Sequence, residues 1–224
     1  MMSPGTPRFL SRKDFMSSKR TDYLPWDAAF LAVATIFMGR SKDPNTRNGA
    51  CIVSPDYKKI AVGYNGFPRG CSDDEFPWGA EGEHSWETKY DYAEHAERNA
   101  IDNTTFETEG STMWIFSERG YFPCPSCARG ILQHGIKNVV LAFIGKQGSK
   151  KYSFDNTEGT RRMFRAAGVR VRVLDDKAIL YLRMVNKLLV ESVDMIENRR
   201  CSKEELKHIE EMMDIDKKWL HVIK

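Results

Sequence analysis

Residues 113–143 read MWIFSERGYFPCPSCARGILQHGIKNVVLAF, and this stretch carries the clearest structural pattern in the chain. The apolar run 113–116 predicts a strand, 124–133 predicts a helix, and 138–143 predicts a second strand. A helix between two strands is typical of layered α/β architecture. The stretch therefore favours an α/β fold.

Segments on both sides extend this pattern. An amphipathic helix is expected over 26–40, with Asp22 available to cap it and Gly39 near its end. The other expected elements are strands at 50–53 and 59–63 joined by a turn at 54–56, a long loop at 65–92, a helix that starts at His95, a helix near 158–167 and a strand at 169–174. Together they predict a three-layer α/β/α sandwich around a five-stranded mixed sheet.

The composition is that of an ordinary globular protein. The 224 residues are 41% hydrophobic and 29% charged, with a net charge of +3. This charge is too small for a surface that coats nucleic acid, so no nucleic-acid partner is expected. No apolar run is long enough to cross a bilayer, so no membrane partner is expected. Five cysteines without a secretory signal pattern predict a reducing, cytoplasmic environment without disulfides.

Three regions are expected along the chain. Residues 1–21 are basic and rich in serine, which is typical of a disordered tail, although a transit peptide has the same composition. Residues 22–175 form the predicted sandwich domain. Residues 176–224 carry an apolar stripe at helical spacing and a capping box at 202–205, so a helical extension is expected there, with a packing or oligomer surface.

The most specific motif is HAE at 95–97 with PCPSC at 123–127 downstream. His95, Cys124 and Cys127 supply three zinc ligands and leave the fourth tetrahedral position open to water, which is typical of a catalytic zinc site. The two cysteines are three residues apart. They therefore fall on one face of a helix whose start is set by the flanking prolines.

Glu97 completes the motif and is expected to carry protons, because a fourth protein ligand would close the metal site. A different interpretation remains open. Cys-x-x-Cys alone is commonly a structural zinc knuckle or a redox pair, and a lone histidine is usually an ordinary helix residue. The chain would then be a non-catalytic, zinc-stabilised binding module in which Glu97 is incidental. The presence of both halves in this order favours catalysis.

Between residues 23 and 175 the chain resembles the deoxycytidylate (dCMP) deaminases of the cytidine deaminase superfamily. The resemblance rests on SKDPNT at 41–46, GACIV at 49–53, GYNGFP at 63–68 with RGCSDD at 69–74, KYDY at 89–92, HAE at 95–97 and FPC at 122–124. The His-x-Glu and Pro-Cys-x-x-Cys pair is itself a known signature of zinc deaminases. The GYNGFP segment separates the chain from generic cytidine and tRNA deaminases. A cytidine deaminase-like fold is implied.

The resemblance implies hydrolytic deamination of dCMP to dUMP and ammonia on Zn²⁺, which supplies dUMP for thymidylate synthesis. Glu97 would move a proton from water to the ring and on to the leaving amine. The N–H of Ala96 would donate to the base carbonyl. Asn65 would bind the sugar or the base, although Asn before Gly also suits a plain turn. A polar loop suited to the 5′-phosphate, or simply solvated, contains Ser41, Lys42, Asn45 and Arg47.

Regulation and assembly are also implied by the resemblance. Members of this family are typically homo-oligomers, often hexamers, activated by dCTP with Mg²⁺ and inhibited by dTTP. The segment 63–74 resembles the effector loop of the family. Effector contacts are expected at Gly63, Tyr64, Gly66, Arg69 and Asp73.

Three features depart from the family pattern. Asn48 stands where an apolar residue is usual, which would change the floor of the pocket. Residues 118–121 are inserted before Phe122, where the superfamily has a short connection. The region beyond 176 lies outside the resemblance. The insertion leaves open the same chemistry on dCTP or on a 5-modified dCMP, whereas the modest charge disfavours a nucleic-acid substrate.

Overall fold

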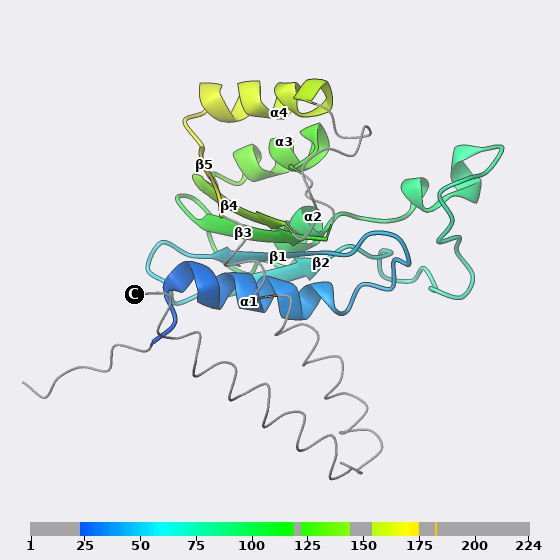
Figure 1. The fold of residues 1–224 in the computed structure, drawn as a ribbon, viewed down its shortest axis with the longest axis horizontal. Helices are drawn as coiled ribbons and strands as arrows, with labels where there is room; N and C mark the ends of the chain where they lie inside the picture. The colour runs from blue at the N-terminus through cyan, green and yellow to red at the C-terminus, as the bar shows by residue number, and fades with distance from the viewer. Residues whose placement is uncertain (1–22, 119–121, 144–153, 175–181, 183–224) are drawn as a thin grey trace, which may run out of the picture.

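A computed structural model of the chain describes residues 23–118, 122–143, 154–174 and 182. Within them, five strands form one sheet in the order β2-β1-β3-β4-β5 (Figure 1). The pairs β1–β2 and β1–β3 are antiparallel, whereas β3–β4 and β4–β5 are parallel, so the expected mixed sheet is confirmed. The strands are β1 (Asn48–Val53), β2 (Ile60–Tyr64), β3 (Thr112–Ser117), β4 (Asn138–Phe143) and β5 (Arg170–Val173).

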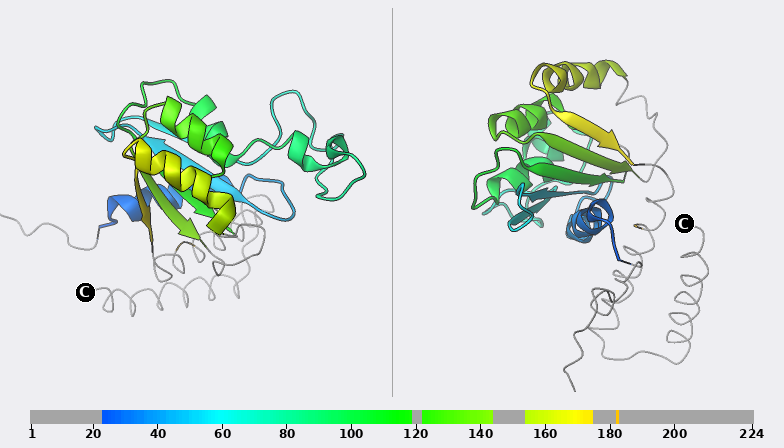
Figure 2. Two further views of the ribbon diagram at one scale, coloured as in Figure 1. Left: turned by 90° about the horizontal axis from the view of Figure 1, so that it is seen from above. Right: turned by 90° about the vertical axis from the view of Figure 1, so that its left-hand side faces the viewer.

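Helices cover both faces of this sheet, as expected. The described helices are α1 (Trp26–Met38), α2 (Ala96–Asp102), α3 (Pro125–Gln133) and α4 (Phe154–Ala166). Figures 1 and 2 show α1 on one face and the other three helices on the opposite face. The three-layer α/β/α sandwich is therefore confirmed.

The side chains of β1 explain why the layers form. Ala50 and Ile52 belong to the apolar cluster under α2, α3 and α4, whereas Cys51 and Val53 belong to the cluster under α1. Successive side chains of a strand point to opposite faces. Because both faces are covered by helices, all four positions are buried and the strand is a continuous apolar run in the sequence.

Two details of the helices differ from the expectation. Helix α1 starts after Pro25, whose side chain makes no capping hydrogen bond, and the expected cap Asp22 lies outside the described residues. A fixed proline φ suits the entry to a helix, so no capping side chain is needed. Helix α4 begins at Phe154, four residues before the expected start near 158. The polar residues and the glycine of its first turns weaken the apolar pattern there.

Several expectations fall on residues that the structure does not describe. The predicted tail at 1–21, the segment 119–121 and nearly all of the predicted helical extension at 176–224 lie outside the described ranges. Leu182 is described, and it is buried in the apolar cluster that also contains Phe30 of α1. Among the described residues, no helix combines the length and the apolar character needed to span a bilayer.

Helix α2 packs against β2 through a very close backbone contact at Gly63. A Cβ atom at this position would collide with the backbone carbonyl oxygen of Ala96 and the backbone nitrogen of Ala100. Both obstacles are main-chain atoms of one helix, so neither can move alone. Gly63, expected to contact an effector, therefore has a packing role as well.

We expect Gly63→Ala to lower the free energy of unfolding by about 1–3 kcal/mol or more, because the added methyl overpacks the α2–β2 contact. Urea denaturation followed by circular dichroism would measure the loss. The control is Gly159→Ala in α4, where the position is exposed and no atom lies within 4 Å of the added Cβ. That change should stabilise the protein by roughly 0.5–1 kcal/mol. Equal stability of the two variants would contradict the close contact.

Candidate functional site

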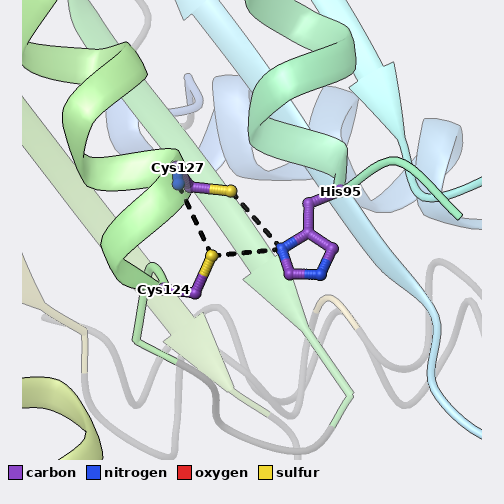
Figure 3. Close-up of side chains that lie close together, drawn as sticks. All are labelled: His95, Cys124 and Cys127. Atoms are coloured by element: carbon purple, nitrogen blue, oxygen red, sulfur yellow. Dashed lines mark hydrogen bonds between the residues drawn. The ribbon is translucent and has the colours of Figure 1, made fainter. Parts of the chain in front are cut away.

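Three potential metal ligands converge where α2 and α3 begin (Figure 3). His95 is the N-cap residue of α2, Cys124 is the N-cap residue of α3, and Cys127 lies in the first turn of α3. The Nδ1 atom of His95 lies 3.5 Å from Sγ of Cys124 and 3.4 Å from Sγ of Cys127. The three ligands therefore lie at the starts of two helices, α2 and α3.

The cluster has the dimensions of a zinc site. All three ligand atoms lie within 4.8 Å of one another. Around a tetrahedral zinc ion, sulfur and nitrogen ligands lie roughly 3.5–3.8 Å apart, given the usual metal–ligand distances. Two sulfurs and one imidazole nitrogen also match the donor types that zinc prefers. These residues could therefore hold zinc and leave its fourth position open.

Local sequence explains why the cysteines meet the histidine. Pro125 occupies the first turn of α3 and fixes where the helix starts, and Sγ of Cys124 accepts a hydrogen bond from the backbone N–H of Cys127 at 3.4 Å. On the other side, Gly66 and Glu94 exchange two backbone hydrogen bonds of 3.1 and 2.9 Å just before His95. Gly66, expected to contact an effector, thus anchors the entry to α2.

The surroundings favour the thiolate at Cys124, whereas its hydrogen bond with Cys127 and burial raise the pKa of the Cys127 thiol. The hydrogen bond with Cys127, helped by His95, lowers the pKa of the Cys124 thiol to about 3 against the opposing effect of burial. The thiolate is the form of cysteine that binds zinc. A deprotonated sulfur is therefore available at neutral pH.

Glu97 lies in the first turn of α2 and is buried. Burial raises the pKa of its carboxyl group, and the neighbouring His95 opposes this shift. A carboxyl group whose pKa is raised by burial holds a proton more readily than an exposed one, which suits general acid–base chemistry. Its place beside the ligand cluster suits a proton carrier.

A pocket of about 230 Å³ opens over the cluster. One wall comes from residues 90–94, at the end of the long loop, and the other includes Ser126 between the two cysteines. A larger cavity of about 370 Å³ lies at the opposite end of the strands, where β3 begins at Thr112 and β4 begins at Asn138. That cavity contains no residue of the zinc motif, so the smaller pocket is the candidate site.

Two cations of the expected phosphate loop are paired within the protein. The Lys42 ammonium group forms an exposed ion pair with Asp73, which links this loop to the expected effector segment. The Arg47 guanidinium donates two hydrogen bonds to Glu118, the first residue of the predicted insertion. A phosphate at this loop would compete with both carboxylates.

The other expected members of this loop are also engaged. The Ser41 hydroxyl donates to the backbone carbonyl of Asn65 at 2.8 Å. The backbone N–H of Asn45 donates to the Asp43 carboxylate at 2.8 Å. The loop is therefore folded back onto the end of β2. Ala96, expected to bind the base carbonyl through its N–H, is the first residue of α2, where backbone N–H groups lack helical partners.

Asn65 is buried and holds several backbone segments together. Its Nδ2 donates to the Asp43 carboxylate at 3.3 Å and to the Thr46 carbonyl at 2.9 Å, and its Oδ1 accepts from the Asn48 N–H at 2.8 Å. Both amide protons are thus used within the protein. One lone pair of Oδ1 remains for a ligand.

Two more residues that were expected to contact an effector, Tyr64 and Arg69, lie at the end of β2 and in the loop after it. The backbone carbonyl of Tyr64 accepts a hydrogen bond of 2.7 Å from Asn99 of α2. Arg69 is exposed in the loop that follows β2.

A buried ion pair between Lys89 and Asp43 was not predicted from the sequence. The two side chains are 9% and 3% exposed, and the backbone N–H of Lys89 also donates to Gly79 at 2.8 Å. Both residues lie in family-like motifs, but charged side chains are rarely buried, so their pairing had no sequence signal. The pair fixes the pocket wall at 90–94 to the phosphate-loop candidate.

The chain is similar to a known family of proteins. Residues 24–143 match the family model described as the cytidine and deoxycytidylate deaminase zinc-binding region. The deoxycytidylate deaminase of Mus musculus is 41% identical over 165 residues, which cover 73% of this chain and 88% of the mouse protein. That of Homo sapiens is 43% identical over 155 residues, which cover 69% of this chain and 82% of the human protein.

Solved structures are also similar. The crystal structure of dCMP deaminase from the cyanophage S-TIM5 in apo form matches with a TM-score of 0.47 and 22% sequence identity. The match covers 66% of this chain and 96% of the cyanophage chain.

We expect Lys89→Met to lower the free energy of unfolding by about 3–5 kcal/mol, because the Asp43 carboxylate is left buried without its cation. The double variant Lys89→Met/Asp43→Asn should recover much of this loss, since it removes the orphaned charge. Chemical denaturation of both variants measures the difference. Lys42→Met is the matched control: it breaks an exposed pair, so its cost should stay within about 1 kcal/mol. Similar losses for the Lys42 and Lys89 single variants would contradict the buried pair.

Proposed function

The chain belongs to the cytidine and deoxycytidylate deaminase zinc-binding family, and from this premise we propose that it hydrolyses dCMP to dUMP and ammonia. One observation carries the proposal: two thiols and an imidazole converge within 4.8 Å beside the buried carboxyl group of Glu97. The 230 Å³ pocket above them gives a small substrate access to the cluster. A hydrolase acting on the C–N bond of a pyrimidine uses this combination of groups.

In this proposal His95, Cys124 and Cys127 hold Zn²⁺. When bound, the ion supplies a water molecule of lowered pKa. Glu97 would take a proton from the attacking water, hold it on its carboxyl group and deliver it to ring N3 while the water oxygen bonds to C4. It would then carry the second proton of that oxygen to the exocyclic nitrogen, so that the C4–N bond breaks, the C4 carbonyl forms and ammonia leaves. The raised pKa of its buried carboxyl group favours the protonated form that delivers these protons.

The remaining parts of the proposal concern how the nucleotide is bound. The N–H of Ala96 donates to the base carbonyl at the start of α2, and the free lone pair of Asn65 accepts from the sugar. The loop with Ser41, Lys42, Asn45 and Arg47 binds the 5′-phosphate by exchanging its internal carboxylate partners for phosphate oxygens. Lys42 is paired with Asp73 and Arg47 with Glu118, and these ion pairs support a loop that is held in one conformation before the phosphate binds.

We also propose the wider role that the family resemblance implies. The product dUMP supplies thymidylate synthesis in the cytoplasm, and the enzyme works as a homo-oligomer, with a hexamer favoured. Activation by dCTP with Mg²⁺ and inhibition by dTTP act through the segment 63–74. The Lys42–Asp73 pair supports this regulation, because it joins the effector segment to the proposed phosphate loop. A second candidate substrate is dCTP or a 5-modified dCMP. The hydrogen bond from Arg47 to Glu118 favours it, because it joins the predicted insertion to the proposed phosphate loop.

Glu97→Gln should lower kcat with dCMP by about 10²- to 10⁴-fold, because the amide cannot carry a proton. Zinc content, measured by atomic spectroscopy, should stay equal to that of the wild type. Glu109→Gln is the control, since this side chain is 72% exposed and lies far from the cluster. Normal turnover by the Glu97 variant would overturn the mechanism, and loss of zinc would make Glu97 part of the metal site.

Regulation is tested with substrate saturation curves. At dCMP concentrations below KM, dCTP with Mg²⁺ should raise the rate and dTTP should lower it, since each nucleotide would favour one of two states of the enzyme. Light scattering on the same samples reports the oligomer. Curves that neither nucleotide changes would contradict the proposed regulation and leave the deaminase reaction intact.

A further inference from the structure

Three polar side chains form a row across the end of the sheet. The strand register places Asn48 of β1 opposite Ser117 of β3. On the other side, the backbone N–H of Asn65 donates to the Asn48 carbonyl, just beyond β2. The row therefore reads Asn65, Asn48, Ser117 and occupies the last register position before the loops.

The row lies on the face that carries the candidate site. Asn48 alternates with Gly49, so its side chain shares a face with that of Ala50, which packs in the cluster with Ala96 of α2. The opposite cluster, under α1, contains neither residue. Asn48 thus faces the layer in which α2 and α3 begin.

The direction of α2 brings its N-terminus to this row. Asn103, at the C-terminal end of α2, donates to the carbonyl of Val62, whereas Asn99 donates to the carbonyl of Tyr64. Moving back along the helix therefore moves forward along β2, towards Asn65. The first turn of α2, with Glu97, is the part of the helix nearest to Asn48.

Asn48 has hydrogen-bonding capacity that the protein does not use. Its Oδ1 atom is buried and accepts no hydrogen bond, a condition shared among the described residues only by Oγ of Ser111. The neighbouring Asn65, by contrast, has two internal acceptors for its amide protons. A buried amide oxygen without a donor costs free energy, because it has lost water and gained nothing. Such a group near the first turn of α2 is accounted for when a ligand supplies the donor.

We propose that Asn48 determines substrate specificity by accepting, through Oδ1, a hydrogen bond from an N–H or O–H group of the bound nucleotide. The inference rests on the proposed function, because it assigns a contact to the substrate of that reaction. Deoxycytidylate offers two kinds of donor, the exocyclic amine of the base and the 3′-hydroxyl of the sugar. An apolar residue at position 48 could accept from neither.

The test compares Asn48→Val with Asn48→Thr, which have the same shape and differ by one hydroxyl. Valine should lower kcat/KM for dCMP by about 10- to 100-fold while the melting temperature stays equal or rises, since an unsatisfied polar atom is removed. Threonine keeps an acceptor and should lose less. The control is Ser111→Ala, which removes the other unpartnered oxygen before the start of β3, away from the site, and should leave kcat/KM unchanged.

The two possible donors are separated by a second substrate, 2′,3′-dideoxycytidine monophosphate. If the 3′-hydroxyl donates to Asn48, the loss caused by valine disappears with this substrate. If the amine donates, the loss is the same for both substrates. Either result supports the contact. A valine variant that keeps kcat/KM within twofold of the wild type, with a normal melting temperature, overturns it.

Failure of the proposed function would look different. A wild-type protein that binds dCMP without releasing ammonia would overturn the reaction. The contact would then be judged by calorimetry, where valine should raise Kd by the same factor. A wild-type protein that does not bind dCMP would overturn both proposals.

Discussion

The backbone contact between β2 and α2 at Gly63 is the constraint on which the site depends. It brings the main chain of the helix against the main chain of the strand, which no larger residue allows. The helix start then has one position relative to the sheet, and that start carries His95, Ala96 and Glu97. The cysteines of α3 can complete the cluster because the parallel pairing of β3 and β4 sets where α3 begins. The position of the ligand cluster thus depends on a packing contact that includes none of the three ligand residues.

Much of the architecture could be predicted from the sequence because it follows from local patterns. Strand β4 was predicted with its observed bounds, and β1, β3 and α3 within two residues, since the strands are apolar runs and the prolines beside Cys124 mark the start of the helix. The convergence of His95 with the cysteines was also predictable, because the spacing of zinc ligands is itself a local pattern. Helix α1 begins at Trp26 as predicted, and the residue before it is a proline that makes no side-chain capping hydrogen bond.

The surroundings of the cluster could not be predicted in the same way. The Lys89–Asp43 pair joins residues 46 apart in the chain, and neither residue type indicates burial. The unused oxygen of Asn48 is likewise a property of what surrounds it, not of asparagine. Both features arise when loops fold over the sheet end, where hydrogen-bond partners come from distant segments. A polar residue there can stabilise the fold or bind a ligand, and the residue type alone does not distinguish the two roles.

The paired backbone of Gly66 and Glu94 closes the long loop at its base, just before the site begins. With the two ends of the loop joined, the part between Asp73 and Lys89 can lengthen or shorten at little cost in free energy, since closure entropy grows slowly with loop length. Its tip could therefore diversify during evolution, through insertion or deletion, without displacing the helix start that follows. Changes in regulation or assembly could accumulate in that part of the loop while the groups at the start of α2 keep their positions.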